Sequence, residues 1–204
     1  MAVDESESEL YYAGAVEGAS SAVQSALVHT PLDGGQPCPL VSSLFLGDIT
    51  VGPAGVYWAD ITGVLYRWAR DGSGTTPLAS APPSSGEYFG IGFGGIAVGD
   101  DEVYWGVAGS LMATPAEGGA TTTLASAPHT WIADLAIDAS AVYWTAVPDD
   151  LSLGGGAVMK APRAGGPVVT LASGLTLPFG IAVDAEGVYV TDPVDGTVER
   201  ITRE

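Results

Sequence analysis

Apolar residues along this chain fall in short runs separated by glycine-rich and polar turns. In four places the run is nearly continuous, which is typical of a strand buried on both faces. These runs are Ile49-Thr50-Val51, Ile96-Ala97-Val98, Leu135-Ala136-Ile137 and Ile181-Ala182-Val183. A tight turn and then an aromatic strand follow each run. No segment has the apolar spacing of a helix, so the pattern predicts an all-β protein.

The aromatic strand recurs five times. Its tyrosines stand at positions 11, 57, 104, 143 and 189, which gives steps of 46, 47, 39 and 46 residues. The copies are Tyr11-Tyr12-Ala13, Val56-Tyr57-Trp58-Ala59, Val103-Tyr104-Trp105-Gly106, Val142-Tyr143-Trp144-Thr145 and Val188-Tyr189-Val190-Thr191. A β-rich repeat of this length, punctuated by glycine, is the signature of a propeller blade.

Two further strands complete each repeat. Third strands are expected at 26–30, 64–69, 110–114, 157–161 and 197–202, and a Gly-rich turn leads from each of the first four to a fourth strand. We therefore predict one β-propeller domain, 1–204, with four complete four-stranded blades and one three-stranded blade. The repeats are expected at approximately 1–43, 44–80, 81–127, 128–174 and 175–204. Either five blades close a ring or the chain is part of a larger, six-bladed ring.

Composition narrows the classes of partner. The formal net charge is −18, from 24 acidic and 6 basic residues, which argues against nucleic acid because phosphates require a positive groove. Cys38 is the single cysteine, so no intrachain disulfide forms. No apolar run reaches the ~18 residues of a membrane span, and the acidic N-terminus does not look like a signal peptide.

The motifs resemble the Tyr-Trp-Thr-Asp (YWTD) and NHL-type propeller repeats of the six-bladed TolB-like superfamily. Val142-Tyr143-Trp144-Thr145 and Val188-Tyr189-Val190-Thr191-Asp192 carry this resemblance best. The chain is also similar to bacterial propeller proteins with Gly-Gly turns, which are often predicted to be secreted or lipid-anchored. The resemblance therefore implies a location outside the cell or in the cell envelope. It covers essentially the whole chain and is specific for the fold, whereas such repeats serve many functions.

Charges are distributed unevenly over the predicted blades. The loops that would open on the axial face contain carboxylates and no Lys or Arg; the carboxylates are Glu17, Asp48, Asp60, Glu87, Asp134, Asp149, Asp150, Asp192 and Asp195. All six cations lie on third strands or their turns. Arg67, Lys160 and Arg200 share one repeat position, and Arg70, Arg163 and Arg203 share another. This regularity indicates a structural role for the cations and an acidic axial face.

Two carboxylates are candidates for a metal site. Asp48 and Asp134 precede inner strands, where the other two repeats have Gly95 and Gly180. With Glu87 they would supply part of the oxygen shell that calcium prefers. The alternative is that each aspartate binds backbone amides where a strand begins.

Aromatic residues in the same loops are candidates for ligand contacts. An exposed ring beside carboxylates suits a sugar or a cationic ligand, and packing between blades is the alternative. The candidate ligand-binding residues are Glu87, Tyr88, Phe89, Trp131 and Phe179. The first three lie in the longest connection between repeats, 80–94.

No local motif for catalysis is present, since the two histidines are isolated and neither a nucleophile elbow nor a phosphate loop occurs. The leading hypothesis is a noncatalytic binding or scaffold propeller that presents its acidic loop face to a protein, a glycan, a small molecule or a cation. The alternative is a divalent-metal-dependent hydrolase resembling the gluconolactonase propellers. Those enzymes typically use an asparagine ligand, and this sequence contains no asparagine.

Overall fold

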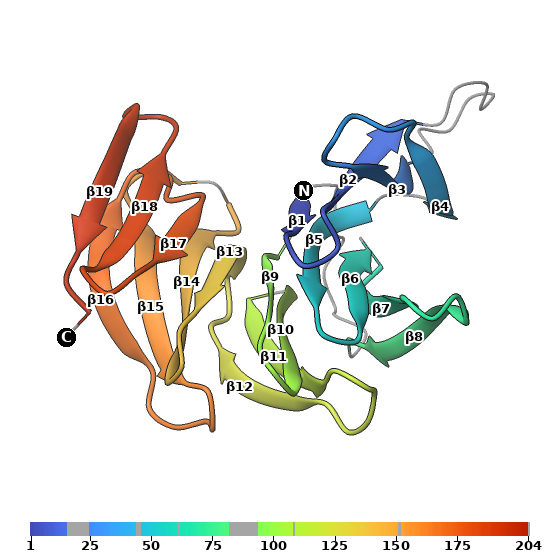
Figure 1. Ribbon diagram of the computed structural model, residues 1–204. Coiled ribbons are helices and arrows are strands. Elements are labelled where there is room, and N and C mark those ends of the chain that lie inside the picture. Colours follow the sequence, from blue (N-terminus) through green and yellow to red (C-terminus); the bar gives the residue numbers. More distant parts are fainter. Residues whose placement is uncertain are drawn as a thin grey trace.

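The computed structural model describes residues 1–15, 25–43, 46–60, 62–81, 94–107, 109–150 and 152–203, and every regular element in these ranges is a β-strand. The strands form five antiparallel sheets, four with four strands and one with three. Strands that are consecutive in the chain are neighbours in each sheet (Figure 1). The predicted all-β propeller architecture is confirmed, including the shorter last blade. No helix in these ranges is long and apolar enough to cross a membrane.

Each sheet corresponds to one sequence repeat. The first contains β1 (Ala2–Asp4), β2 (Glu9–Ala15), β3 (Ser25–Pro31) and β4 (Cys38–Ser43), and the second contains β5 (Leu46–Gly52), β6 (Gly55–Asp60), β7 (Val64–Ala69) and β8 (Gly74–Ser80). The third contains β9 (Ile96–Val98), β10 (Glu102–Val107), β11 (Ser110–Pro115) and β12 (Thr122–Ser126). The fourth contains β13 (Thr130–Ile137), β14 (Ala141–Pro148), β15 (Gly156–Pro162) and β16 (Val169–Leu175), and the last contains β17 (Ile181–Val183), β18 (Val188–Asp192) and β19 (Thr197–Ile201).

The sheets follow one another along an arc. Their first strands contact in the order β1, β5, β9, β13 and β17, and Figure 1 shows the first and last sheets at the two ends of the arc. The first strand of every sheet is therefore the inner one, as in a propeller. The aromatic second strand lies next to it in each sheet.

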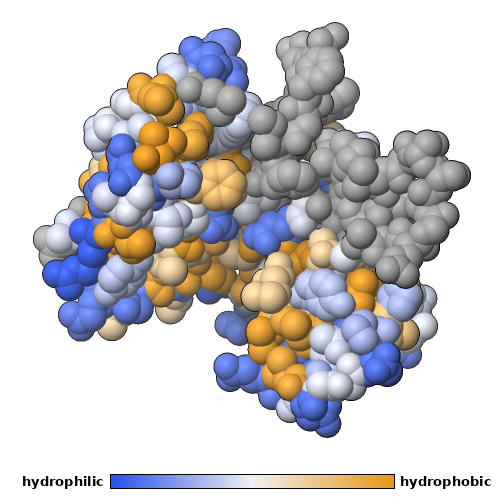
Figure 2. All heavy atoms as spheres, turned by 90° about the horizontal axis from the view of Figure 1, so that it is seen from above, coloured by the Kyte–Doolittle hydropathy of each residue, from blue (hydrophilic) through white to orange (hydrophobic). Residues whose placement is uncertain are grey.

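The core lies between neighbouring sheets. Tyr57 and Leu65 of the second sheet pack with Val103 and Trp105 of the third, and all four side chains are fully buried. The side chains of the aromatic repeat thus provide the packing between blades, as expected of large aromatic residues. Apolar residues also reach the surface in separate groups among polar ones (Figure 2).

Two inner strands are longer than the sequence indicates. β5 pairs with β6 on both sides of an irregularity between Leu46 and Ile49. β13 pairs with β14 on both sides of an irregularity between Ile132 and Leu135. The aspartates of these two repeats stand within the irregularities. β9 and β17, whose repeats have glycine there, contain only three residues each. Because a bulge leaves a main-chain group unpaired, a nearby carboxylate can compensate for the lost strand pairing.

Candidate functional site

Asp48 and Asp134 join neighbouring sheets through main-chain hydrogen bonds. Oδ1 of each accepts the N–H of the following residue at 2.8 Å. Oδ2 of Asp134 accepts the N–H of Ile181 in the next sheet at 2.9 Å, and Oδ2 of Asp48 accepts that of Ile96 at 3.5 Å. In each side chain, Oδ1 therefore binds an amide just after the irregularity of its own strand, and Oδ2 binds the first amide of the next inner strand.

Burial gives Asp134 unusual acid–base behaviour. It raises the pKa of this carboxyl to about 6, although the N–H bonds from Ile181 and Leu135 oppose the increase. The negative charge of Asp48 raises the pKa further. The charge of Asp48 therefore acts on Asp134 in the neighbouring part of the arc.

Beside Asp134, the exposed ring of Phe179 stands on a firmly held backbone. The side chain is 54% exposed. Its N–H donates to the carbonyl of Thr191 at 2.8 Å, and its carbonyl accepts the hydroxyl of Thr145 at 2.8 Å. The same Thr145 oxygen accepts the N–H of Asp134 at 3.1 Å. Because Thr145 and Thr191 belong to different sheets, Phe179 is fixed at the interface between them.

Asp192 fixes the beginning of the same connection. This buried carboxylate accepts the N–H of Leu177 at 2.7 Å through Oδ2 and that of Val194 at 3.1 Å through Oδ1. Burial acts to raise the pKa of Asp192, but the N–H bonds outweigh it, and the pKa lies below its ordinary value. The connection that presents Phe179 is therefore held by the aspartate of the last motif copy.

Trp131 lies on the same end of the fourth sheet. It belongs to β13, pairs with Val147 and is half-buried. Next to it, the exposed His129 places Nδ1 at 3.3 Å from Oδ2 of Asp149. We call the surface that includes Asp134, Phe179, Trp131 and the His129–Asp149 pair the loop face. It lies at the end of the sheets where the connections between sheets and between second and third strands are found.

The remaining predicted site residues, Glu87, Tyr88 and Phe89, lie outside the described residues. Among the residues that are described, no three His, Cys, Asp or Glu side chains lie close enough together to hold a metal ion. A calcium site formed by Asp48, Asp134 and Glu87 therefore stays a prediction.

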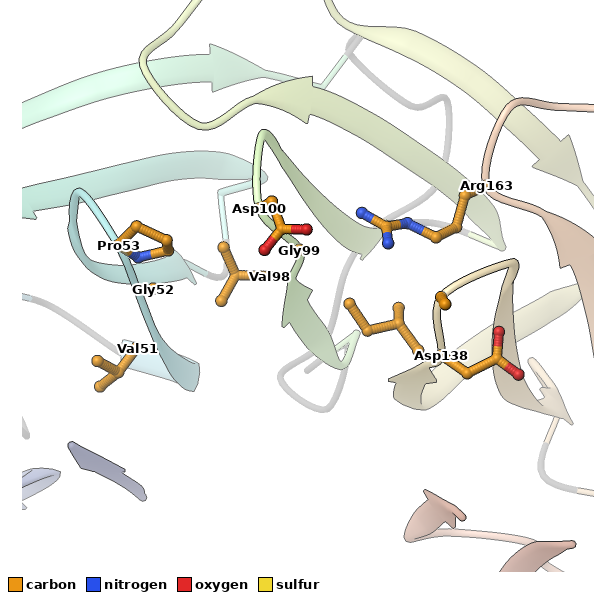
Figure 3. Close-up of a pocket in the computed structure, with 10 residues that line it drawn as sticks. Val51, Gly52, Pro53, Val98, Gly99, Asp100, Asp138 and Arg163 are labelled. Carbon is orange, nitrogen blue, oxygen red and sulfur yellow. The ribbon is translucent and has the colours of Figure 1, made fainter. Parts of the chain in front are cut away.

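A second feature lies at the opposite end of the sheets, which we call the turn face. A hollow of about 330 Å³ is lined by the turns after the inner strands of the second, third and fourth sheets and by Arg163. Figure 3 shows the Arg163 guanidinium directed toward Gly99 and Asp100. Nε of Arg163 also donates to the Tyr104 hydroxyl at 3.1 Å, so this cation already has a partner within the protein.

The sequence interpretation missed the role of the two threonines. Thr145 and Thr191 end copies of the aromatic motif whose other copies have Ala13, Ala59 and Gly106. That difference was the available signal, because a hydroxyl can accept one main-chain N–H and donate to a carbonyl, whereas alanine and glycine have no polar side-chain atom. It distinguishes the interface between the fourth and last sheets from the other interfaces.

Comparisons with known proteins support the fold. No family model matches the sequence, and no curated protein matches it. Among solved structures, the crystal structure of a nidogen/laminin complex contains a chain with a TM-score of 0.66 and 15% identity, and the match covers 100% of this chain and 78% of that one.

Two bacterial proteins are also similar. Regucalcin from Agrobacterium tumefaciens, described as a calcium-binding protein, has a TM-score of 0.60 and 17% identity over 79% of this chain and 55% of its own. The extracellular domain of a hybrid two-component system from B. thetaiotaomicron has a TM-score of 0.72 and 12% identity, and it covers 100% of this chain. This chain matches only 27% of that larger protein. With five sheets in one arc and the aromatic repeat on each second strand, the chain is a β-propeller repeat protein whose repeats resemble the Tyr-Trp-Thr-Asp type.

Proposed function

We propose that this propeller is a noncatalytic binding module whose loop face binds a basic segment of a protein partner, outside the cell or in the cell envelope. The observation that carries the proposal is the exposed Phe179 ring on a backbone fixed by Thr145 and Thr191. A rigid aromatic side chain loses little conformational entropy on binding and is a frequent anchor of protein interfaces.

Charge supports a basic partner. The exposed Asp149 belongs to the loop face and the exposed Asp150 follows it directly, and the chain carries a net charge of −18. The cations lie elsewhere: Arg67, Lys160 and Arg200 lie on third strands, and the other three lie beyond the ends of those strands. An acidic surface favours the approach and orientation of a positively charged partner.

The structural neighbours support the proposed location. One similar chain comes from a nidogen/laminin complex and another is an extracellular domain. At 15% and 12% identity these likenesses establish the fold, and they make binding outside the cell a consistent proposal for this chain.

A fluorescent tetralysine peptide tests this proposal. We expect saturable binding that weakens as salt concentration rises and that falls at least about tenfold in Phe179→Ala. Val168→Ala is the matched control, because Val168 is an exposed apolar residue in the connection after β15 at the turn face. Equal binding by both variants would contradict the proposal. Binding of neutral oligosaccharides without binding of tetralysine would instead favour a glycan ligand.

Two observations favour the metal-dependent alternative. A structural neighbour is described as a calcium-binding protein, and Asp48 and Asp134 interact electrostatically. Calorimetric titration of calcium into chelator-treated protein separates the alternatives. Saturable heat that disappears in the Asp48→Asn, Asp134→Asn double variant would favour the metal site. Hydrolysis of a lactone by the calcium-loaded protein would then support the enzyme.

A further inference from the structure

Arginines at one repeat position connect neighbouring sheets. Arg70, Arg163 and Arg203 each follow the turn-face end of a third strand. Arg70 binds the carboxylate of Asp4 in the preceding sheet. Arg163 reaches the Tyr104 hydroxyl of its preceding sheet, and Arg203 binds the carboxylate of Asp138 in the same way. The arginine of one sheet therefore docks on the turn face of the sheet before it.

Asp138 shows how the receiving sheet is constructed. Its Oδ1 holds its own turn by accepting the N–H groups of Ser140 at 2.7 Å and Ala141 at 2.8 Å. Its Oδ2 accepts the Tyr143 hydroxyl at 2.8 Å and binds Arg203. One oxygen thus organises the turn, and the other receives the arginine together with the tyrosine of the aromatic repeat.

The interface between the second and third sheets lacks an arginine at this repeat position, but an ion pair from another position still joins the two sheets. The third sheet has Ala116 at the arginine position. There, Arg67 of the second sheet binds Glu117 of the third. Each of the four interfaces between neighbouring sheets is thus bridged by an arginine, in one direction or the other.

The last sheet repeats the receiving arrangement without its arginine. Oδ1 of Asp184 accepts the N–H groups of Glu186 at 2.8 Å and Gly187 at 3.1 Å, as Asp138 does in its own turn. Within the described residues, neither Oδ2 of Asp184 nor the Tyr189 hydroxyl has a hydrogen-bond partner. Their counterparts in the fourth sheet, Oδ2 of Asp138 and the Tyr143 hydroxyl, are the two groups that bind Arg203.

Apolar burial also distinguishes the outer face of the last sheet from the equivalent faces of the other sheets. Val158 and Val198 occupy the same repeat position, because Val158 pairs with Thr145 and Val198 pairs with Thr191. The last sheet covers Val158, which is 0% exposed, whereas Val198 is 70% exposed. The outer face of the last sheet therefore has the polar and apolar features of a face that elsewhere in the molecule is covered by another sheet.

We propose that the outer face of the last sheet, defined by Asp184, Tyr189 and Val198, binds a further β-sheet whose turn after the third strand carries an arginine. This occupant adds one sheet to the arc and pairs its guanidinium with Asp184 and Tyr189. It is an assembly surface separate from the loop face.

Charge complementarity selects this occupant over a second copy of the chain. The first sheet has Leu32 at the arginine position, where the side chain is 50% exposed. Docking of that sheet would bury Asp184 against a leucine and leave the carboxylate unpaired, which is strongly unfavourable. Nor does Arg200 fill the position. In the strand register Arg200 stands opposite Tyr189, as Lys160 stands opposite Tyr143 in the fourth sheet. There, the Tyr143 hydroxyl still binds Arg203 although Lys160 is present.

The chain's own repeat provides a probe of the right chemistry. The full chain is extended after Arg203 by a second copy of residues 164–203. The copy provides a fourth strand for the last sheet, then a further sheet, and finally a second Arg203 at the docking position. The test compares the thermal unfolding midpoint of this extended chain with the midpoints of three variants. One carries Asp184→Asn in the original segment, one carries Arg203→Leu in the added copy, and the third carries both substitutions.

We expect each single substitution to lower the midpoint of the extended chain by about 4 °C or more, and the double substitution to lower it no further than one single substitution. Asn keeps the turn contacts of Asp184, so in the natural chain the same Asp184→Asn should shift the midpoint by about 2 °C or less. Additive effects would overturn the proposal. So would an added segment that proteases remove while residues 1–203 stay intact.

Discussion

At the scale of single residues, one hydroxyl group organises the most distinctive interface of the molecule. The buried Thr145 accepts the N–H of Asp134 and donates to the carbonyl of Phe179. It therefore couples the bulged inner strand of the fourth sheet to the connection that presents the exposed ring. Thr191 occupies the same motif position in the last sheet and binds Gly180 at an exposed site.

Thr145→Val should be more costly than Thr191→Val. Valine has nearly the same shape, but it leaves the part-buried N–H of Asp134 and the carbonyl of Phe179 without their partner. We expect a loss of about 2 kcal/mol. Thr191→Val exposes its former partners to water and should cost less than about 1 kcal/mol. Denaturant unfolding of both variants measures the difference. Equal losses would mean that Thr145 does not bridge the two sheets.

Asp134 should make stability depend on pH in an unusual direction. Its pKa of about 6 in the folded protein exceeds its ordinary value of 3.8, so the folded state binds more protons between these values. The contribution of Asp134 to stability therefore decreases as pH rises through this range and stays low above it. Asn does not titrate. We expect the stability of the wild type relative to Asp134→Asn to fall by about 1 kcal/mol between pH 5 and pH 7.5.

Denaturant unfolding of both proteins at several pH values checks this expectation. The range avoids the isoelectric point near 4.1, where solubility is lowest. A stability difference that does not change with pH would show that Asp134 has an ordinary pKa. An increase with pH would show that the amide bonds from Ile181 and Leu135 outweigh burial.

At the scale of elements, the repeat in the sequence determines the strands well and their contacts less well. Alternating apolar strands and glycine turns locate all five sheets, since strand formation depends on local pattern. The lengths of β5 and β13 could not be predicted from the sequence, because their bulges depend on amides in the neighbouring sheet. The same reason hides the role of Asp48 and Asp134, which have both local and interblade partners.

The arginines illustrate the same limit. Their regular spacing predicts a structural role, and the structure shows them joining sheets. Their partners Asp4, Tyr104 and Asp138 lie far away in sequence, so spacing alone does not identify them. The candidate ring of Phe179 could be named from its position in a loop, whereas its fixed backbone required the structure.

The contribution of Val158 and Val198 to stability should depend on whether another sheet covers the side chain. Val158→Ala removes two buried methyl groups between the fourth and last sheets, and we expect a loss of about 2 kcal/mol. Val198→Ala removes the same groups from a side chain that is 70% exposed and should change stability by less than about 0.5 kcal/mol. Denaturant unfolding compares the two variants. A substantial loss for Val198→Ala would show that the outer face of the last sheet is already covered in solution.

At the scale of the whole molecule, the two ends of the sheets have different roles in this account. The turn face joins the sheets through arginines and carboxylates, and the cations there are used within the protein. The loop face carries the fixed Phe179 ring together with exposed carboxylates. A propeller with this division can offer one face to a partner without disturbing the contacts that hold its blades together.

The most direct test of this account is a map of where the tetralysine peptide binds. NMR amide shifts of the isotope-labelled full chain are followed during titration with the peptide. We predict that the largest shifts occur at Gly180 and Ile181 beside Phe179 and near Asp149, that they disappear in Phe179→Ala, and that Gly165 at the turn face does not respond. Shifts centred on the turn face, or shifts unchanged in Phe179→Ala, would contradict the claim that the loop face is the binding surface.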